Sequence, residues 1–252
     1  MTFCLGIKVR DGLVGIADTR ITMGSETITA HKVSVFRQDG QTLFLMTSGL
    51  RSVRDKALTY FEEKLAIQKQ PFDRLYKAVN ALAACVRQVE AEDKAALQSA
   101  GLYIDLHCLV GGQLANDGEH KLYLMYPEGN WVEVGAGTPY QIVGIGSYGK
   151  PILDRTLRFE DSLQFALKMG CLAFDSTRIS ASDVDFPVDV VLYRAHTFQV
   201  VQHTYAKEDL LPMCTLWQDT LRRAAVELPS TWVEGALAQL PPPVRPAPGS
   251  AK

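Results

Sequence analysis

The sequence predicts an α+β fold in which two mainly antiparallel β-sheets pack face to face between two layers of helices. Three observations predict it. Apolar runs typical of strands come in pairs joined by short turns, which indicates antiparallel hairpins. Segments with helical periodicity lie in pairs between the groups of strands. The chain has 252 residues, 47% of them apolar, which is enough for one large core.

The first fifty residues predict two hairpins. The first pairs "TFCLGIKV", residues 2–9, with "LVGIAD" across the turn "RDG". A loop is expected over "TRITMGSETI". The second hairpin pairs "TAHKVSVF" with "TLFLMTSG" across "RQDGQ". Four strands are therefore expected before the first helix.

The middle of the chain predicts two helices followed by strands. Apolar side chains recur at helical spacing over about 51–67 and again over about 72–98. Three further strands are expected in "LYIDLHCLVGG", "KLYLMYPEG" and "WVEVGAG". Helices are expected on both outer faces of the two packed sheets.

The last hundred residues repeat the pattern of strand, helices and hairpin. After "YQIVGIG", one helix is expected from near Ser147, and another runs from Glu160–Asp161 to about Asp175. "PVDVVLYR" and "TFQVVQHTY" predict a hairpin, and a helix over about 208–226 follows. We expect one domain over 2–228 and a disordered Pro/Ala-rich tail over 229–252.

Composition excludes several classes of function. The net charge of −2, without a block of like charge, argues against nucleic acid or an anionic membrane as partner. Neither a bilayer-spanning apolar run nor a signal peptide is visible, so a cytoplasmic protein is expected. The five cysteines are scattered without metal-ligand spacing and predict buried free thiols, with no metal or cofactor. They are Cys4, Cys85, Cys108, Cys171 and Cys214.

The start of the chain carries a possible chemistry. Removal of Met1 would leave Thr2 with a free amine and a hydroxyl on one residue. An α-amine has a pKa of about 8, close to the operating pH, so it suits a general base. Thr2 would then hold nucleophile and base together. Taken alone, Thr2 is equally consistent with an ordinary strand start.

Two charged residues at neighbouring strand ends strengthen the catalytic interpretation. Asp18 ends the second expected strand, and Lys32 begins the third. A lysine beside Thr2 would lower the pKa of its hydroxyl and amine, and an aspartate would hold that lysine in place. A plain salt bridge between Asp18 and Lys32 is the simpler alternative.

Several stretches resemble proteasome β-type subunits of the Ntn-hydrolase superfamily, and most of all the bacterial proteasome-like peptidases of the Anbu and betaproteobacterial proteasome homolog group. They run from residue 2 to about 205 and read "TFCLGIKVRDGLVGIADTR", "KVSVF", "FLMTSG", "VGIGSYG" and "FPVDVVLYR". The resemblance implies the αββα sandwich of that superfamily. It implies that Thr2 attacks, that Asp18 and Lys32 tune it, and that the N–H of Gly49 stabilises the oxyanion.

The sequence departs from that family in its supporting residues. The family's serine in the Gly-rich turn aligns with Ile145, and Ser147 is the nearby hydroxyl. The family's later Asp-Ser pair corresponds to Asp175 and Ser176, with Ser180 and Ser182 as alternatives, in a loop after a helix where capping is the simpler role. "GIGSYG" also fits G-x-G-x-x-G, but the hairpins before it argue against a dinucleotide site.

The resemblance also suggests the substrate site and the assembly. It places Ala30, Thr47 and Arg51 at the first substrate pocket, although ordinary packing would equally explain them. The implied function is a self-compartmentalising threonine peptidase that cleaves peptides or unfolded proteins. A homo-oligomeric ring, expected as a double ring, would enclose the site, and an unfoldase partner is left open. The alternatives are a catalytically silent ring scaffold and an Ntn amidase for small amides.

Overall fold

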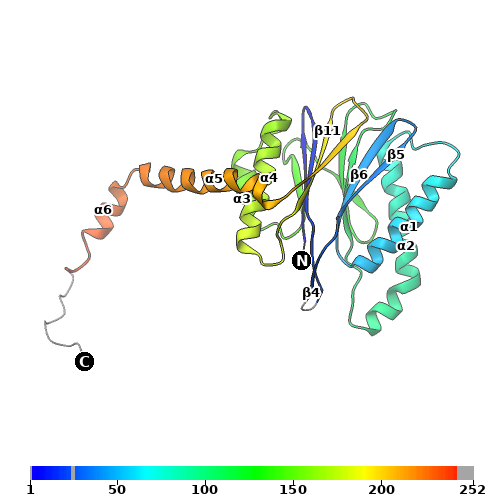
Figure 1. The fold of residues 1–252 in the computed structure, drawn as a ribbon, viewed down its shortest axis with the longest axis horizontal. Helices are drawn as coiled ribbons and strands as arrows, with labels where there is room; N and C mark the ends of the chain where they lie inside the picture. The colour runs from blue at the N-terminus through cyan, green and yellow to red at the C-terminus, as the bar shows by residue number, and fades with distance from the viewer. Residues whose placement is uncertain (1, 24–25, 243–252) are drawn as a thin grey trace. The chain divides into compact units, whose positions relative to one another are not determined.

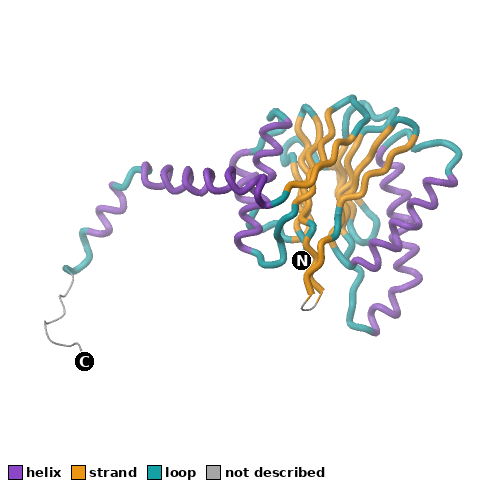
Figure 2. Tube along the Cα trace, viewed as in Figure 1, coloured by secondary structure: helices purple, strands orange, loops and turns teal. Residues whose placement is uncertain are grey.

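The computed structural model describes residues 2–23 and 26–242, with residues 21–23 and 26–28 described by their backbone alone. Two five-stranded antiparallel sheets lie at the centre, with helices on both outer sides (Figures 1 and 2). The predicted αββα sandwich is therefore confirmed.

The first sheet contains the strand that follows Thr2. Its order is β10-β1-β2-β11-β12, and every neighbouring pair is antiparallel. The strands are β10 (Tyr140–Gly144), β1 (Phe3–Val9), β2 (Gly12–Asp18), β11 (Val188–Arg194) and β12 (Val200–Tyr205). All residues of β1 and β2 are buried, because the second sheet covers one face and helices cover the other.

The second sheet packs against the first. Its order is β5-β6-β7-β8-β9, again antiparallel throughout. The strands are β5 (Val33–Gln38), β6 (Gln41–Ser48), β7 (His107–Gly112), β8 (Lys121–Met125) and β9 (Trp131–Glu133). Apolar side chains of both sheets, including Cys4, Phe44 and Met46, fill the space between them.

The loop expected over "TRITMGSETI" is wrong. Its backbone forms an antiparallel pair, β3 (Arg20–Met23) and β4 (Glu26–Thr29), separate from both large sheets. Polar residues occupy much of this stretch, so it lacks the run of apolar residues that predicts a buried strand.

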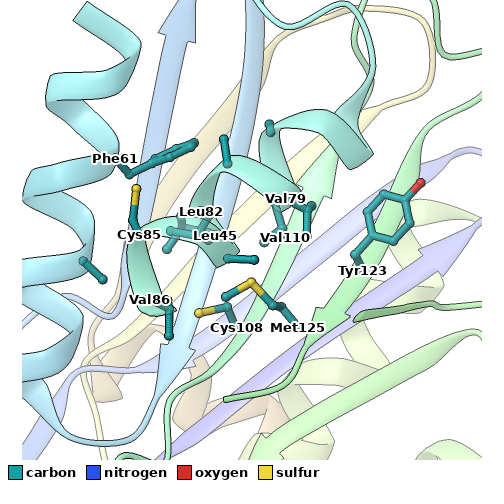
Figure 3. Close-up of a cluster of buried hydrophobic side chains, with 14 of the residues drawn as sticks. Leu45, Phe61, Val79, Leu82, Cys85, Val86, Cys108, Val110, Tyr123 and Met125 are labelled. Atoms are coloured by element: carbon teal, nitrogen blue, oxygen red, sulfur yellow. The ribbon is translucent and has the colours of Figure 1, made fainter. Parts of the chain in front are cut away.

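The helices form the two outer layers. α1 (Arg51–Ile67) and α2 (Leu75–Ser99) lie on the second sheet, where α2 contacts β7 and β8. Figure 3 shows Phe61 of α1 and Val79, Leu82 and Val86 of α2 gathered over that sheet. On the other side, α4 (Leu163–Ser180) lies on β1 and β2, and α3 (Lys150–Thr156) packs against α4.

The bounds of α4 correct two expectations. The helix begins after Ser162, whose Oγ accepts from the Phe165 N–H at 3.2 Å, so the acidic pair 160–161 lies before it. It continues to Ser180, past the end expected at Asp175. Asp175, Ser176 and Ser180 are therefore helical residues and do not lie in a loop after the helix.

The C-terminal part contains α5 (Lys207–Glu227) and α6 (Thr231–Leu237), and the chain divides into compact units at Leu210/Leu211. α6 forms inside the stretch 229–252, where the sequence predicts disorder. Residues 243–252 of that stretch lie outside the described residues. None of the helices in the described parts of the chain has the length and apolar character needed to cross a membrane.

Candidate active site

Three chain segments meet at Thr2. Thr2 lies just before β1, and its carbonyl accepts from the Ile145 N–H at 2.8 Å. Gly144, at the end of β10, has a φ of 86°, and a Cβ there would lie 1.9 Å from the same carbonyl oxygen and 3.4 Å from Ser48 Oγ. Only glycine therefore allows the end of β10 to approach Thr2 this closely.

Asp18 joins the first residues of the chain to Lys32. Its Oδ1 accepts from the Phe3 N–H at 2.8 Å, and its Oδ2 accepts from Lys32 Nζ at 2.6 Å. The Asp18 side chain is fully buried, and that of Lys32 is 4% exposed. Lys32 Nζ also donates to the Arg20 carbonyl at 2.7 Å. The lysine is thus fixed next to the amide that links Thr2 to Phe3.

Lys32 and Asp18 form a buried ion pair. Burial raises the pKa of the Asp18 carboxyl, while the Lys32 ammonium and the Phe3 N–H act in the opposite direction. The 2.6 Å contact pairs the two buried groups, which offsets the cost of removing each charge from water. Cys4, in the same surroundings, has a thiol pKa raised by burial and donates to the Thr47 carbonyl, as a structural thiol does.

Gly49 occupies a backbone position that other residues rarely adopt. It follows the last residue of β6, with a φ of 134°, and a Cβ there would lie 1.9 Å from the Asp105 carbonyl oxygen. Because Ser48 Oγ lies near Gly144, whose neighbour Ile145 binds the Thr2 carbonyl, the Gly49 amide belongs to the same end of the sandwich. A backbone N–H near a nucleophile is the type of donor that forms an oxyanion hole.

The sequence as a whole matches a known protein family. The family model for the proteasome subunit matches residues 2–184, most of the chain. The chain belongs to the proteasome subunit family. No curated protein matches it.

Solved structures of Anbu proteins share the fold. Anbu from Hyphomicrobium sp. strain MC1 is 28% identical with a TM-score of 0.80, over 90% of this chain and 98% of that one. Anbu from Yersinia bercovieri is 26% identical with a TM-score of 0.82, over 90% and 97%. A helical assembly of the Anbu complex from Pseudomonas aeruginosa is 27% identical with a TM-score of 0.84, over the same shares.

The supporting residues suggested by the proteasome subunit resemblance lie in different surroundings. Ser147 is exposed in the turn before α3, two residues after Ile145. Asp175 is buried on α4 and pairs with Arg178 at 2.5 Å. The guanidinium of Arg178 lies 5.2 Å from the ring centre of Phe186. Within the described residues, the charged contact of Asp175 is thus Arg178 rather than Lys32.

The three substrate-binding candidates lie around the start of α1 and the strands before it. The Ala30 N–H donates to the Thr19 carbonyl at 2.8 Å. Thr47 is buried in β6, opposite Cys108 of β7. Arg51 is exposed at the first position of α1, and its Nε lies 3.2 Å from Asp55 Oδ2.

Sequence reasoning missed the main-chain groups that hold Lys32. The Arg20 carbonyl accepts from Lys32, and the Arg20 side chain lies 3.3 Å from Asp185 Oδ2. Next to it, the buried Thr19 hydroxyl donates to the Pro187 carbonyl at 2.8 Å. A carbonyl has no signature in the sequence, because every residue carries one. In the sequence, only the place of Arg20 just after the expected strand "LVGIAD" pointed to this segment.

The motif "GIGSYG" lies where a dinucleotide site does not form. It follows β10, an antiparallel edge strand, and precedes α3, a helix of only 7 residues. A dinucleotide fingerprint joins a parallel strand to a long helix. Among the described residues, no group of three His, Cys, Asp or Glu side chains lies where it could hold a metal ion.

Proposed function

We propose that the protein is an N-terminal threonine peptidase of the proteasome subunit family. One observation carries the proposal. Asp18 is buried and bonds both the Phe3 N–H and Lys32 Nζ, so a buried ammonium lies beside the first peptide of the chain. A buried ion pair adds little to stability, because desolvation offsets most of the attraction. A role in chemistry at Thr2 explains why the charges are kept there.

The proposed reaction begins once Met1 has been removed. The Thr2 amine accepts the hydroxyl proton while Oγ attacks the carbonyl carbon of a peptide bond. The Gly49 N–H stabilises the oxyanion of the tetrahedral intermediate. The intermediate collapses to an ester on Thr2, and the proton passes to the leaving amine. Water then attacks the ester and frees the carboxylic acid and Thr2.

Lys32 supports the first of these steps through its charge. A fixed ammonium stabilises the ionised Oγ and lowers the pKa of the Thr2 amine, which keeps a larger fraction of that amine free to act as base. The Arg20 carbonyl and Asp18 hold Nζ from two sides. Ser147 and Asp175 complete the proposed site as supporting residues, and Ala30, Thr47 and Arg51 as substrate-binding residues.

The proposed substrate is a peptide or an unfolded protein, cleaved within a homo-oligomer. The similar Anbu complex from Pseudomonas aeruginosa forms a helical assembly, which supports self-association of this chain. We propose a ring, and specifically a double ring, that encloses Thr2. A ring scaffold without activity is the alternative, and the intact Asp18–Lys32 pair argues against it. Turnover of small amides without peptide cleavage would favour an amidase.

The direct test compares Thr2→Ala with Thr2→Ser. We expect Thr2→Ala to lose peptide hydrolysis and modification by epoxyketones, because both need the hydroxyl. Thr2→Ser keeps a hydroxyl and should retain part of both. Thr138→Ala, at an exposed loop threonine, is the matched control. Size-exclusion chromatography should show the same assembly for all variants. Equal modification of wild type and Thr2→Ala would contradict the proposal.

A further inference from the structure

The segment that carries Lys32 is not part of a sheet. Residues 30–32 lie between β4 and β5 and belong to neither strand. The Ala30 N–H reaches the Thr19 carbonyl, and Lys32 is held by its own Nζ. The position of the lysine therefore depends on what fixes the residue between them.

His31 is bound to the first sheet through its side chain. Its Nδ1 lies 2.7 Å from Asp189 Oδ2, on β11. The other oxygen of Asp189 accepts from Thr204 Oγ1 at 2.6 Å, on the neighbouring strand β12. Asp189 is fully buried, whereas the His31 side chain is 63% exposed. Both oxygens of a buried carboxylate are thus occupied, one by each neighbour.

His31 is also bound through its main chain. Its carbonyl accepts from Arg54 Nη1 at 3.2 Å, on α1. The residue before Lys32 is therefore attached to the first sheet on one side and to α1 on the other. Rotation of this segment would break a contact at each end.

The two carboxylates that hold this segment lie on adjacent strands. In the register of β2 and β11, Asp18 lies opposite Val188, and Asp189 lies opposite Ala17. Asp18 binds Lys32, and Asp189 binds His31. Two neighbouring strand positions thus fix two consecutive residues. The contact between the buried Asp189 carboxylate and the exposed His31 adds little stability, because desolvation of the carboxylate offsets the attraction. It does fix the position of His31 relative to β11.

We propose that His31 and Asp189 are positioning residues, which hold the chain so that Lys32 Nζ stays at Asp18 and next to Thr2. This inference rests on the proposed function for its effect on rate. His31 acts through Lys32 and touches neither substrate nor Thr2 in the proposal. Loss of the contact displaces the ammonium and slows attack by Thr2, while the fold remains.

The test uses His31→Ala, His31→Asn and the control His203→Ala in the full-length protein. Asparagine places an amide nitrogen where Nδ1 lies and can donate to Asp189. His203 is an exposed histidine on β12 that contacts Tyr205 and not Asp189. The rate of Thr2 modification by an epoxyketone is measured by intact mass. Hydrogen exchange of the peptides over 26–35 measures how firmly the segment is held.

We expect His31→Ala to slow modification by about tenfold to a hundredfold, the cost of a misplaced group. His31→Asn should restore most of the rate, and His203→Ala should leave it unchanged. Exchange over 26–35 should rise in His31→Ala alone. The unfolding temperature of His31→Ala should fall, because one oxygen of the buried Asp189 loses its partner, but should stay above the assay temperature. The proposal is overturned if His31→Ala reacts and exchanges like wild type, or if His31→Asn restores neither quantity.

The two proposals fail in distinguishable ways. If wild type is not modified at Thr2, the proposed function fails, and hydrogen exchange alone decides on the role of His31. If wild type is modified and His31→Ala is modified equally fast, the peptidase stands and the positioning role is wrong.

Discussion

The two ends of β1 and β2 carry buried polar groups of different kinds. At the end near Thr2, the buried groups are the charged pair Asp18 and Lys32. At the other end, Gln113 accepts from the Tyr193 hydroxyl at 3.0 Å and lies 3.1 Å from His196 Nδ1. The far-end network centred on Gln113 is built from an amide, a phenol and an imidazole. It joins the loops that follow β7 and β11.

The two sets of buried polar groups suggest different roles, a structural one around Gln113 and a chemical one around Lys32. The groups around Gln113 satisfy one another, as buried polar groups in a stable core do. An ammonium has three N–H donors, and the described residues accept two of those of Lys32, at Asp18 and at the Arg20 carbonyl. The end near Thr2 keeps a charge pair with both members buried, whereas the carboxylates that the buried Lys8 contacts at the far end are partly exposed. We read this contrast as the mark of the active end.

The largest effect is expected at Lys32, and the buried Lys8 near the far end is its control. Lys32→Met should abolish peptide hydrolysis and lower the free energy of unfolding by about 3–5 kcal/mol, because Asp18 is left buried and unpaired. Lys8, equally buried near the far end, pairs with Glu119 and Glu133, which Lys121 also contacts. Those carboxylates are partly exposed, so Lys8→Met should cost less than about 1 kcal/mol and leave activity intact.

A double variant separates the two effects at Lys32. In Asp18→Asn/Lys32→Met both charges are gone, so most of the stability should return while activity stays absent. Urea unfolding and peptide hydrolysis measure the two quantities. Activity in the double variant close to that of wild type would show that the charged pair is structural.

Two glycines with the same geometry test the oxyanion donor. Gly49 and Gly12 have φ values of 134° and 150°, and a Cβ at either would lie 1.9 Å from a carbonyl oxygen. Alanine at either position should cost about 1–3 kcal/mol from backbone strain, measured by thermal unfolding. Gly49→Ala should also lower turnover by about a hundredfold, because it displaces the proposed donor. Gly12→Ala, at the far end, should keep its turnover.

The proposed role of the Gly49 N–H is contradicted if both glycine variants lose turnover to the same extent. If Gly12→Ala and Gly49→Ala lose stability and turnover in parallel, Gly49 matters for the fold and not for an oxyanion. Turnover is compared below the unfolding temperature of both variants, so that unfolded protein does not contribute.

The smallest expected effect is a pH dependence of the free energy of unfolding, which arises from His120 at the far end. Burial lowers the pKa of His120, whose Nε2 lies 2.8 Å from the Val9 carbonyl oxygen. Below the ordinary histidine pKa of about 6.5, the unfolded chain binds a proton that the folded chain refuses, so the free energy of unfolding falls as pH falls. His120→Gln, which keeps a donor for Val9, should show a weaker fall. Urea unfolding at about pH 7.5 and 5.5 measures this difference, and identical slopes would contradict it.

Much of the fold was predictable because its signals are local. Strand pairs such as 2–9 and 13–18 have short turns and dense apolar side chains, and helix 51–67 has a clear apolar face. The β3–β4 pair was missed because it belongs to no large sheet and lacks that apolar pattern. The extension of α4 beyond Asp175 was missed because the two serines and the threonine in "DSTRIS" suggested a loop.

The site was predictable where side chains carry the role. Asp18 and Lys32 stand at strand ends, and hairpin geometry brings strand ends together. The contact between His31 and Asp189 was not predictable, because 158 residues separate the two and no spacing rule joins them. The pairing of Asp175 with Arg178 could be predicted only with the correct end of α4. Side chains three residues apart in the sequence are neighbours on the surface of a helix, and the sequence predicted that the helix ends at Asp175.

The most direct measurement is mass spectrometry of the protein after treatment with a peptide epoxyketone. We expect a mature chain that begins at Thr2, with the adduct on that residue and on no other. Peptide mapping would locate the adduct, and Lys32→Met treated in the same way should carry almost none. A mature chain that keeps Met1, or an adduct at another residue, would contradict the role of Thr2 as nucleophile.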